Sequence, residues 1–216
     1  MENGIIPFEE LKTHIEEVKT GTTTLALVID GGVVIATESQ ATAGYMVATK
    51  NAQKLFKIND QVAATISGGV ADSQYVVGQA QALSRLRTIE DDRPPSLKKI
   101  AMIIRNILFS GRSYYYSFMI VGGYDKETDA GKLYAIDFIG YMAEETTFTS
   151  LGSGMYYALG VLEANWKENM SEEEGVELAR KALTAARERD AGSGYQAQIV
   201  VIKKDEFKPI EGFHGE

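Results

Sequence analysis

The sequence has no cysteine and only two histidines among its 216 residues. The absence of cysteine excludes disulfides, thiolate nucleophiles and cysteine-ligated metals. His14 and His214 both lie near the ends, so no histidine from the body of the chain can act as a general base or a metal ligand. A hydrolase built on this sequence would have to activate its nucleophile with an amine or a carboxylate.

Positive charge and long apolar runs are also scarce. The formal net charge is -8, which argues against nucleic acid or an anionic membrane surface as a partner. No apolar run approaches the roughly 18 residues that a membrane span needs, and Met1–Gly4 lacks the basic start and apolar centre of a signal peptide. We therefore expect a soluble cytoplasmic protein with no nucleic-acid or membrane partner. The 44% hydrophobic content suffices for one sizeable core.

Several β-rich segments are bounded by turn residues. Asp30-Gly31-Gly32 and Asn59-Asp60 each separate two such segments, which predicts two hairpins. The hairpin strands are expected at Thr22–Ile29, Val33–Thr37, Lys54–Ile58 and Gln61–Ile66. Further strands are expected at Ser117–Val121, Leu133–Asp137, Thr146–Leu151 and Gln198–Ile202, and the last of these is expected to be the last strand of the chain.

Apolar residues at helical spacing predict two pairs of helices between these strands. One pair follows Gly69 and is interrupted by Pro94-Pro95; the other follows Gly154 and restarts at Ser171–Glu174, a sequence typical of a capping box. The alternation of strands with helix pairs suits sheets that are covered by helices on their outer faces. Before all of these, Phe8–Lys19 could form a short amphipathic helix.

From Gly21-Thr22-Thr23-Thr24 almost to its end, the chain resembles the β subunits of proteasomes, particularly the archaeal ones. The motifs that carry the resemblance occur in the family's order and at similar separations: Glu38, Lys54, Ser67-Gly68-Gly69, Gly152-Ser153-Gly154 and Asp190-Ala191-Gly192-Ser193-Gly194. The resemblance implies an α+β fold, the four-layer αββα sandwich of the N-terminal-nucleophile hydrolases. It also implies that residues 1–21 are a propeptide removed on maturation and that residues 22–216 form a single catalytic domain.

The resemblance makes Thr22 the nucleophile, exposed by autocatalytic cleavage between Gly21 and Thr22. A free α-amine has a pKa of about 7.7–8.0, close enough to neutral for the amine of Thr22 to accept its own hydroxyl proton. That chemistry would replace the missing histidine. On pattern alone, Thr22 would simply be the first β-branched residue of a strand.

Lys54 matches the family's active-site lysine, whose ammonium would lower the pKa of the nearby Thr22 hydroxyl and amine. Glu38 matches the acidic residue that pairs with this lysine, and a buried ammonium needs such a partner to keep its proton. The ordinary alternative is a solvated surface lysine, although Lys54 begins an apolar strand.

Asp190, Ser193 and Ser153 match the residues that position the Thr22 amine. Each has an ordinary alternative, because Asp190 could end a helix, Ser153 could be an N-cap and Ser193 could be a turn residue beside glycines. The resemblance implies no metal and no organic cofactor.

Gly68 matches the position whose backbone N–H stabilises the oxyanion, although it could equally be a strand-to-helix turn. Thr42 and Ala71 match positions that hydrogen-bond an extended substrate strand. The residues matching the family's first side-chain pocket are all apolar, which favours chymotrypsin-like cleavage: Ala41, Ala52, Phe56, Ile66 and Val70.

The resemblance therefore implies a threonine endopeptidase, made as a zymogen, that degrades unfolded polypeptides. Its implied partners are the other β subunits of a heptameric ring, the proteasome α subunits and a regulatory ATPase. One alternative is a structural ring subunit that keeps its propeptide and does no chemistry. A second is a bacterial ATP-dependent self-compartmentalising peptidase of the same superfamily, although those chains are shorter.

Overall fold

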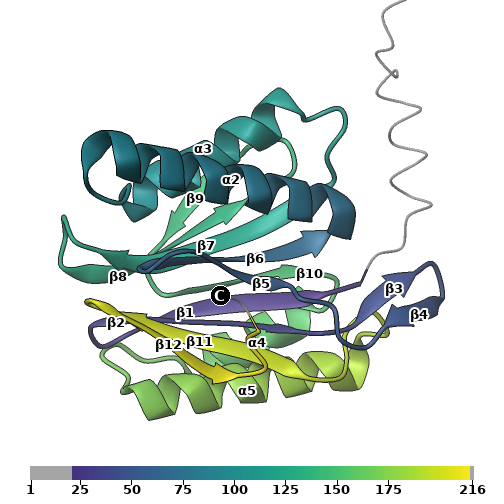
Figure 1. The fold of residues 1–216 in the computed structure, drawn as a ribbon. Helices are drawn as coiled ribbons and strands as arrows, with labels where there is room; N and C mark the ends of the chain where they lie inside the picture. Colours follow the sequence, from purple (N-terminus) through teal and green to yellow (C-terminus); the bar gives the residue numbers. More distant parts are fainter. Residues whose placement is uncertain (1–20, 215–216) are drawn as a thin grey trace, which may run out of the picture.

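The described residues, 21–214 of the computed structural model, form two stacked antiparallel sheets with two helices on each outer face (Figure 1). The first sheet has the strand order β10-β1-β2-β11-β12, with bounds Phe148–Gly152, Thr23–Ile29, Gly32–Glu38, Ala197–Lys203 and Glu206–Glu211. The second sheet has the order β5-β6-β7-β8-β9, with bounds Leu55–Asn59, Val62–Gly68, Ser117–Asp125, Ala130–Ile136 and Met142–Glu145.

The helices divide evenly between the two sheets (Figure 1). Helices α2 (Val70–Asp91) and α3 (Leu97–Ser110) cover the second sheet, and α4 (Met155–Asn165) and α5 (Glu172–Arg189) cover the first. The four-layer αββα arrangement expected from the sequence is confirmed. No helix within residues 21–214 is long and apolar enough to cross a membrane.

Three apolar clusters hold the four layers together. One lies between the first sheet and α4 and α5, one between the second sheet and α2 and α3, and one between the sheets. Strand β11 shows how the pleat distributes side chains among them, since Ile199 and Val201 face the helices while Val200 and Ile202 face the other sheet. A polar side chain on the inward face of β11 therefore points between the two sheets.

Local sequence explains where several elements begin and end. Gly31 has φ +67° in the turn between β1 and β2, a conformation that glycine adopts without strain. Helix α5 begins with the predicted capping box: the Ser171 hydroxyl accepts from the Glu174 N–H, and the Glu174 carboxylate accepts from the Ser171 N–H. The same helix is capped at its C-terminal end by Asp190, whose N–H donates to the Ala186 carbonyl.

Some strands were not predicted. The expectation that β11 is the last strand was wrong, because β12 follows it at the edge of the first sheet. Strand β9 was missed as well, and so were the two strands of a small separate hairpin, β3 (Ala41–Ala43) and β4 (Met46–Thr49). The helix expected at Phe8–Lys19 lies outside the described residues.

Candidate active site

Thr22 immediately precedes β1. Strand β1 is central, pairing with β10 on one side and β2 on the other, so its first residues have fixed positions. The Thr22 carbonyl accepts the Gly154 N–H at 3.4 Å, and Thr22 is 5% exposed. The sequence-predicted partners of Thr22 converge here from the ends of β2, α5 and the β10–α4 turn.

A buried ion pair contacts the Thr22 hydroxyl. The Lys54 ammonium donates to Thr22 Oγ1 at 2.9 Å and to Glu38 Oε1 at 2.5 Å. Lys54 is 1% exposed and Glu38 is fully buried. The second oxygen of Glu38 accepts the N–H groups of Gln40 at 2.6 Å and Gly194 at 3.0 Å, so this carboxylate is fully hydrogen-bonded.

Burial governs the electrostatics of this pair. Burial lowers the pKa of the Lys54 ammonium, and the negative charge of Glu38 opposes that shift. Burial likewise raises the pKa of Glu38, while the charge and hydrogen bond of Lys54 and the N–H donors of Gly194 and Gln40 oppose the rise. In its ionised form the pair places an ammonium in contact with the Thr22 hydroxyl, where a positive charge favours the alkoxide form of that hydroxyl.

Asp190 is the centre of a second polar network on the other side of Thr22. Its Oδ2 accepts from the hydroxyls of Ser153 and Ser193, each at 2.6 Å. Its Oδ1 accepts the Gly192 N–H at 3.1 Å. Ser153 Oγ in turn accepts the Thr22 N–H at 3.1 Å. These hydrogen bonds therefore connect the Asp190 carboxylate to the nitrogen of Thr22 through the hydroxyl of Ser153.

In this structure the Gly21–Thr22 peptide bond is intact. The Thr22 nitrogen is an amide that donates to Ser153, so it cannot accept a proton as a free amine would. The Thr22 hydroxyl donates to the Gly21 carbonyl oxygen at 2.6 Å, and the Gly21 N–H donates to Thr42 Oγ1 at 2.9 Å. The hydroxyl thus lies beside the carbonyl of the bond that was predicted to be cut.

Gly68 ends β6 in a conformation that needs glycine. Its φ is +95°, and a Cβ there would lie 2.5 Å from the Tyr116 carbonyl oxygen. The neighbouring Gly69 N–H donates to the same carbonyl at 2.6 Å, which fixes the turn from β6 into α2. The turn therefore explains why residue 68 is a glycine. Gly68 is also the last residue of β6.

The residues expected to bind substrate come from several segments of the chain. Thr42 lines a pocket of about 370 Å³ beside Gly21 together with Ser153, Ala191 and Gly192. Ala41 lies at the start of β3 and Ala52 in the segment before β5, whereas Val70 and the exposed Ala71 open α2. Phe56 and Ile66 pack against the core beneath α2 and α3. Ile66 is only 1% exposed, so in this structure its side chain belongs to the core.

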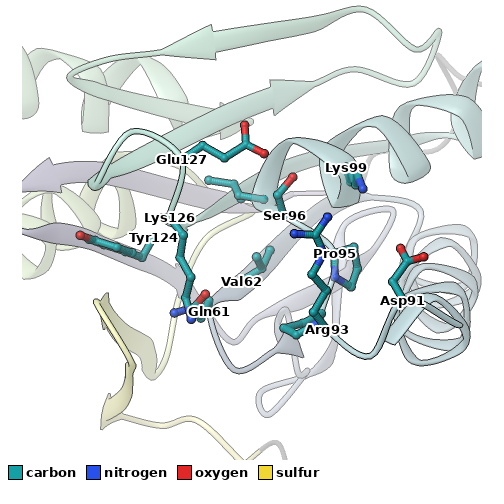
Figure 2. A pocket seen from close by; sticks show the side chains of 12 residues that line it. Gln61, Val62, Asp91, Arg93, Pro95, Ser96, Lys99, Tyr124, Lys126 and Glu127 are labelled. Carbon is teal, nitrogen blue, oxygen red and sulfur yellow. The ribbon is translucent and has the colours of Figure 1, made fainter. Parts of the chain in front are cut away.

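A different pocket, of about 200 Å³, lies at the opposite end of β6 from Gly68 (Figure 2). Its lining comes from the β5–β6 turn, the α2–α3 connection and the β7–β8 turn. Charged side chains of both signs surround it, among them Arg93, Lys126 and Glu127 (Figure 2). It contains none of the predicted site residues, so it has no part in the chemistry at Thr22.

Sequence reasoning missed three residues of this site. Thr23 Oγ1 shares a 2.7 Å hydrogen bond with Ser193, and the Thr23 N–H donates to Glu38 at 3.3 Å. Gly192 packs directly against Gly21. Gln198 hydrogen-bonds the backbone on both sides of Gln53. The one sequence signal for Gln198 is a polar residue within an otherwise apolar strand, and Gly192 stands inside a motif that was noted without a role.

Known proteins resemble this chain over most of its length. The model of the family described as "Proteasome subunit" matches residues 18–202. A protein of Methanocaldococcus vulcanius named "Proteasome subunit beta" is 44% identical over 189 residues, covering 87% of this chain and 84% of its own. Proteins of the same name from Methanocorpusculum labreanum and Ferroglobus placidus are 42% and 38% identical, each alignment covering 89% of this chain and 91% of the relative. The chain therefore belongs to the proteasome subunit family, and within it to the β-type subunits.

Proposed function

We propose that this chain is a catalytic proteasome β subunit whose nucleophile is the hydroxyl of Thr22. One observation carries the proposal. The buried Lys54 ammonium contacts both Glu38 and Thr22 Oγ1. Burying an ion pair against a hydroxyl costs desolvation energy that a purely structural subunit would have no need to spend. The arrangement is instead what activation of a threonine requires.

In the processed enzyme, each group around Thr22 has a distinct role. The free amine of Thr22, oriented by Ser153 and through it by Asp190, accepts the hydroxyl proton. The hydroxyl oxygen attacks the substrate carbonyl, and the Lys54 ammonium stabilises negative charge on that oxygen. The substrate carbon–nitrogen bond then breaks, and the proton held by the Thr22 amine passes to the leaving amine. Water hydrolyses the resulting ester, which releases the acyl product and regenerates the threonine. Ser193 supports Asp190, and the Gly68 N–H stabilises the oxyanion.

The same hydroxyl performs self-cleavage in the intact chain. Thr22 Oγ1 attacks the carbonyl carbon of Gly21, the carbon–nitrogen bond to Thr22 breaks, and the hydroxyl proton ends on the released amine. Water then hydrolyses the Gly21 ester and frees residues 1–21 as a propeptide, leaving 22–216 as the catalytic domain. The 2.6 Å hydrogen bond between the hydroxyl and the Gly21 carbonyl oxygen supports this intramolecular route.

Family membership supports the proposed assembly. Relatives named "Proteasome subunit beta" match most of this chain, so we infer a ring of β subunits, heptameric as in the family, that joins α subunits in a core particle. A regulatory ATPase would feed unfolded polypeptides to it. The cytoplasmic location expected from the sequence stays a prediction. The structural-subunit alternative requires residues 1–21 to persist in the assembled particle.

The intact mass of the subunit from assembled particles tests the proposal. We expect a species that runs from Thr22 to Glu216, because the hydroxyl and the Gly21 carbonyl are already in contact. Thr22→Ala should leave the full-length chain and abolish peptidase activity. Thr88→Ala removes a threonine hydroxyl that bonds only within α2, so it should process normally. A stable full-length wild-type chain in active particles would falsify the assignment of Thr22.

We further propose a chymotrypsin-like preference. The residues matching the first side-chain pocket are Ala41, Ala52, Phe56, Ile66 and Val70, none of which can pair with a charged substrate side chain. Burying a leucine or aromatic side chain there is worth about 1.5–3 kcal/mol, which corresponds to roughly ten- to a hundredfold in rate. Cleavage should therefore be fastest after Leu, Tyr or Phe.

Fluorogenic peptides that differ only in the residue before the scissile bond measure this preference. Ala52→Glu places a carboxylate in the pocket, so it should depress cleavage after Leu and raise cleavage after Arg. Cleavage of the Gly21–Thr22 bond should be largely unaffected, because Gly21 has no side chain to bury. If the wild-type particle cleaves faster after Arg or Glu than after Leu or Tyr, these residues do not form the pocket.

A further inference from the structure

Strand β5 is an edge strand of the second sheet, and Lys54 is the residue immediately before it. On one side the Lys54 carbonyl accepts the Ile66 N–H at 3.0 Å, which continues the pairing with β6. On the other side no strand follows in the sheet order. Lys54 and Leu55 are nevertheless buried, so their N–H groups need another partner.

The side chain of Gln198 provides that partner. Its Oε1 accepts the Lys54 N–H at 3.0 Å and the Leu55 N–H at 3.1 Å, and its Nε2 donates to the Ala52 carbonyl at 2.8 Å. Gln198 is 5% exposed and lies on β11 of the first sheet. One amide group therefore holds residues 52–55 at three points, and it crosses from one sheet to the other to do so.

The same part of the first sheet also positions the partner of Lys54. In the ladder between β2 and β11, Gln198 is opposite Thr37, the residue before Glu38, and Glu38 is opposite Ala197. The Glu38 carboxylate that receives the ammonium and the amide that holds the Lys54 backbone are thus fixed by neighbouring pairs of one ladder. The β2–β11 ladder therefore positions both the backbone of Lys54, through Gln198, and its ammonium, through Glu38.

We propose that Gln198 is a positioning residue for Lys54: by holding the backbone of residues 52–55, its side-chain amide sets the place at which the ammonium meets Thr22 Oγ1. The inference rests on the proposed function of Thr22. It is consistent with the apolar surroundings of the glutamine, since the next inward-facing residues of β11 are Val200 and Ile202. A shift of about 1 Å in a reacting group can cost on the order of a hundredfold in rate.

Gln198→Met keeps the length of the side chain and removes both its acceptor and its donor. In assembled particles this variant should lower kcat by about ten- to a hundredfold. Gln198→Glu retains an acceptor oxygen for the two N–H groups, so it should recover part of the loss. Gln196→Met is the matched control, because the Gln196 side chain is exposed. That control should leave kcat unchanged.

Three readouts separate positioning from a general structural effect. Peptides with Leu or Ala before the scissile bond should lose the same factor in kcat, whereas damage to the pocket at Ala52 would affect the Leu peptide selectively. The maximal rate at which a peptide epoxide modifies Thr22 should fall with kcat, while the concentration for half-maximal rate changes by less than about threefold. The midpoint of thermal unfolding identifies a variant that has merely lost stability.

The inference is overturned if Gln198→Met retains kcat within about twofold of wild type, or if its loss is confined to the Leu peptide. If Gln198→Met does not assemble, Gln198→Glu provides the test, because it lacks the donor to Ala52. A wild-type kcat and a wild-type modification rate in that variant would show that the Gln198 amide does not position Lys54. A wild-type particle that neither cleaves peptides nor reacts at Thr22 contradicts the proposed function instead. The two failures are therefore distinguishable.

Discussion

Lys54→Ala should lower kcat/KM by at least about a hundredfold without unfolding the subunit, a magnitude typical of removing one preorganised charge from an active site. The ammonium lies 2.9 Å from Thr22 Oγ1, so its removal takes away the charge that stabilises the attacking oxygen. It also leaves the buried Glu38 carboxylate without its cation. Peptide hydrolysis by assembled particles measures the rate, and thermal unfolding measures the integrity of the fold.

Lys54→Arg and Lys57→Ala make this test specific. Arginine keeps the positive charge, but its planar guanidinium is larger than an ammonium and cannot place one compact donor between Glu38 and Thr22. Lys54→Arg should therefore be nearly inactive as well. Lys57 is a partly exposed lysine on the neighbouring strand β5 and pairs with Asp60, so Lys57→Ala should retain full activity. Near-normal turnover by Lys54→Arg would remove Lys54 from the mechanism.

The parts of the fold that could be predicted are those whose signals are local. The turn at Gly31 and the capping box at Ser171 are two examples, because in each the residue types themselves favour the local backbone conformation. Strand β12 has no such signal: it is largely exposed, contains Pro209 and exists because β11 offers it a free edge. Such a strand depends on tertiary pairing, which a reading of local patterns does not detect.

The site divides in the same way. Thr22, Lys54 and Asp190 were singled out because their motifs resemble those of a family, yet no local pattern indicates that an ammonium at residue 54 contacts a hydroxyl at residue 22. Gln198 was missed because its role depends on a partner 144 residues away in sequence. A polar residue in a buried strand signals an interaction of some kind, and the structure identifies its partner as the Lys54 backbone.

Gly21 and Gly192 pack with their backbones in direct contact, and this contact bears on self-cleavage. A Cβ on Gly21 would lie 2.0 Å from the Gly192 Cα, and a Cβ on Gly192 would lie 2.3 Å from the Gly21 Cα. Non-bonded carbon atoms do not approach so closely, so a side chain at either position must displace the backbone of the other. The displaced segment includes the Gly21 carbonyl, which the Thr22 hydroxyl contacts at 2.6 Å.

Gly192→Ala should therefore stop, or slow by at least about a hundredfold, the cleavage between Gly21 and Thr22, given how steeply rate depends on the placement of reacting groups. Gly21→Ala should do the same from the other side of the contact. The intact mass of the subunit from assembled particles would then show the full-length chain. Gly160→Ala is the matched control, because a Cβ on that α4 glycine meets no atom within 4 Å.

The mature enzyme should tolerate the Gly192 change far better, because residue 21 is then absent. If Gly192→Ala is made in a chain released directly at Thr22 from a removable fusion partner, the nearest atom left to the new Cβ is Ser153 Oγ at 3.0 Å. A side-chain oxygen can retreat by a few tenths of an ångström at a cost of about 1 kcal/mol, which is less than about tenfold in rate. Gly192→Ala should thus separate propeptide removal from peptide hydrolysis. Normal processing of the full-length variant would contradict the role of this contact, and a pre-processed variant as inactive as Lys54→Ala would assign Gly192 to hydrolysis itself.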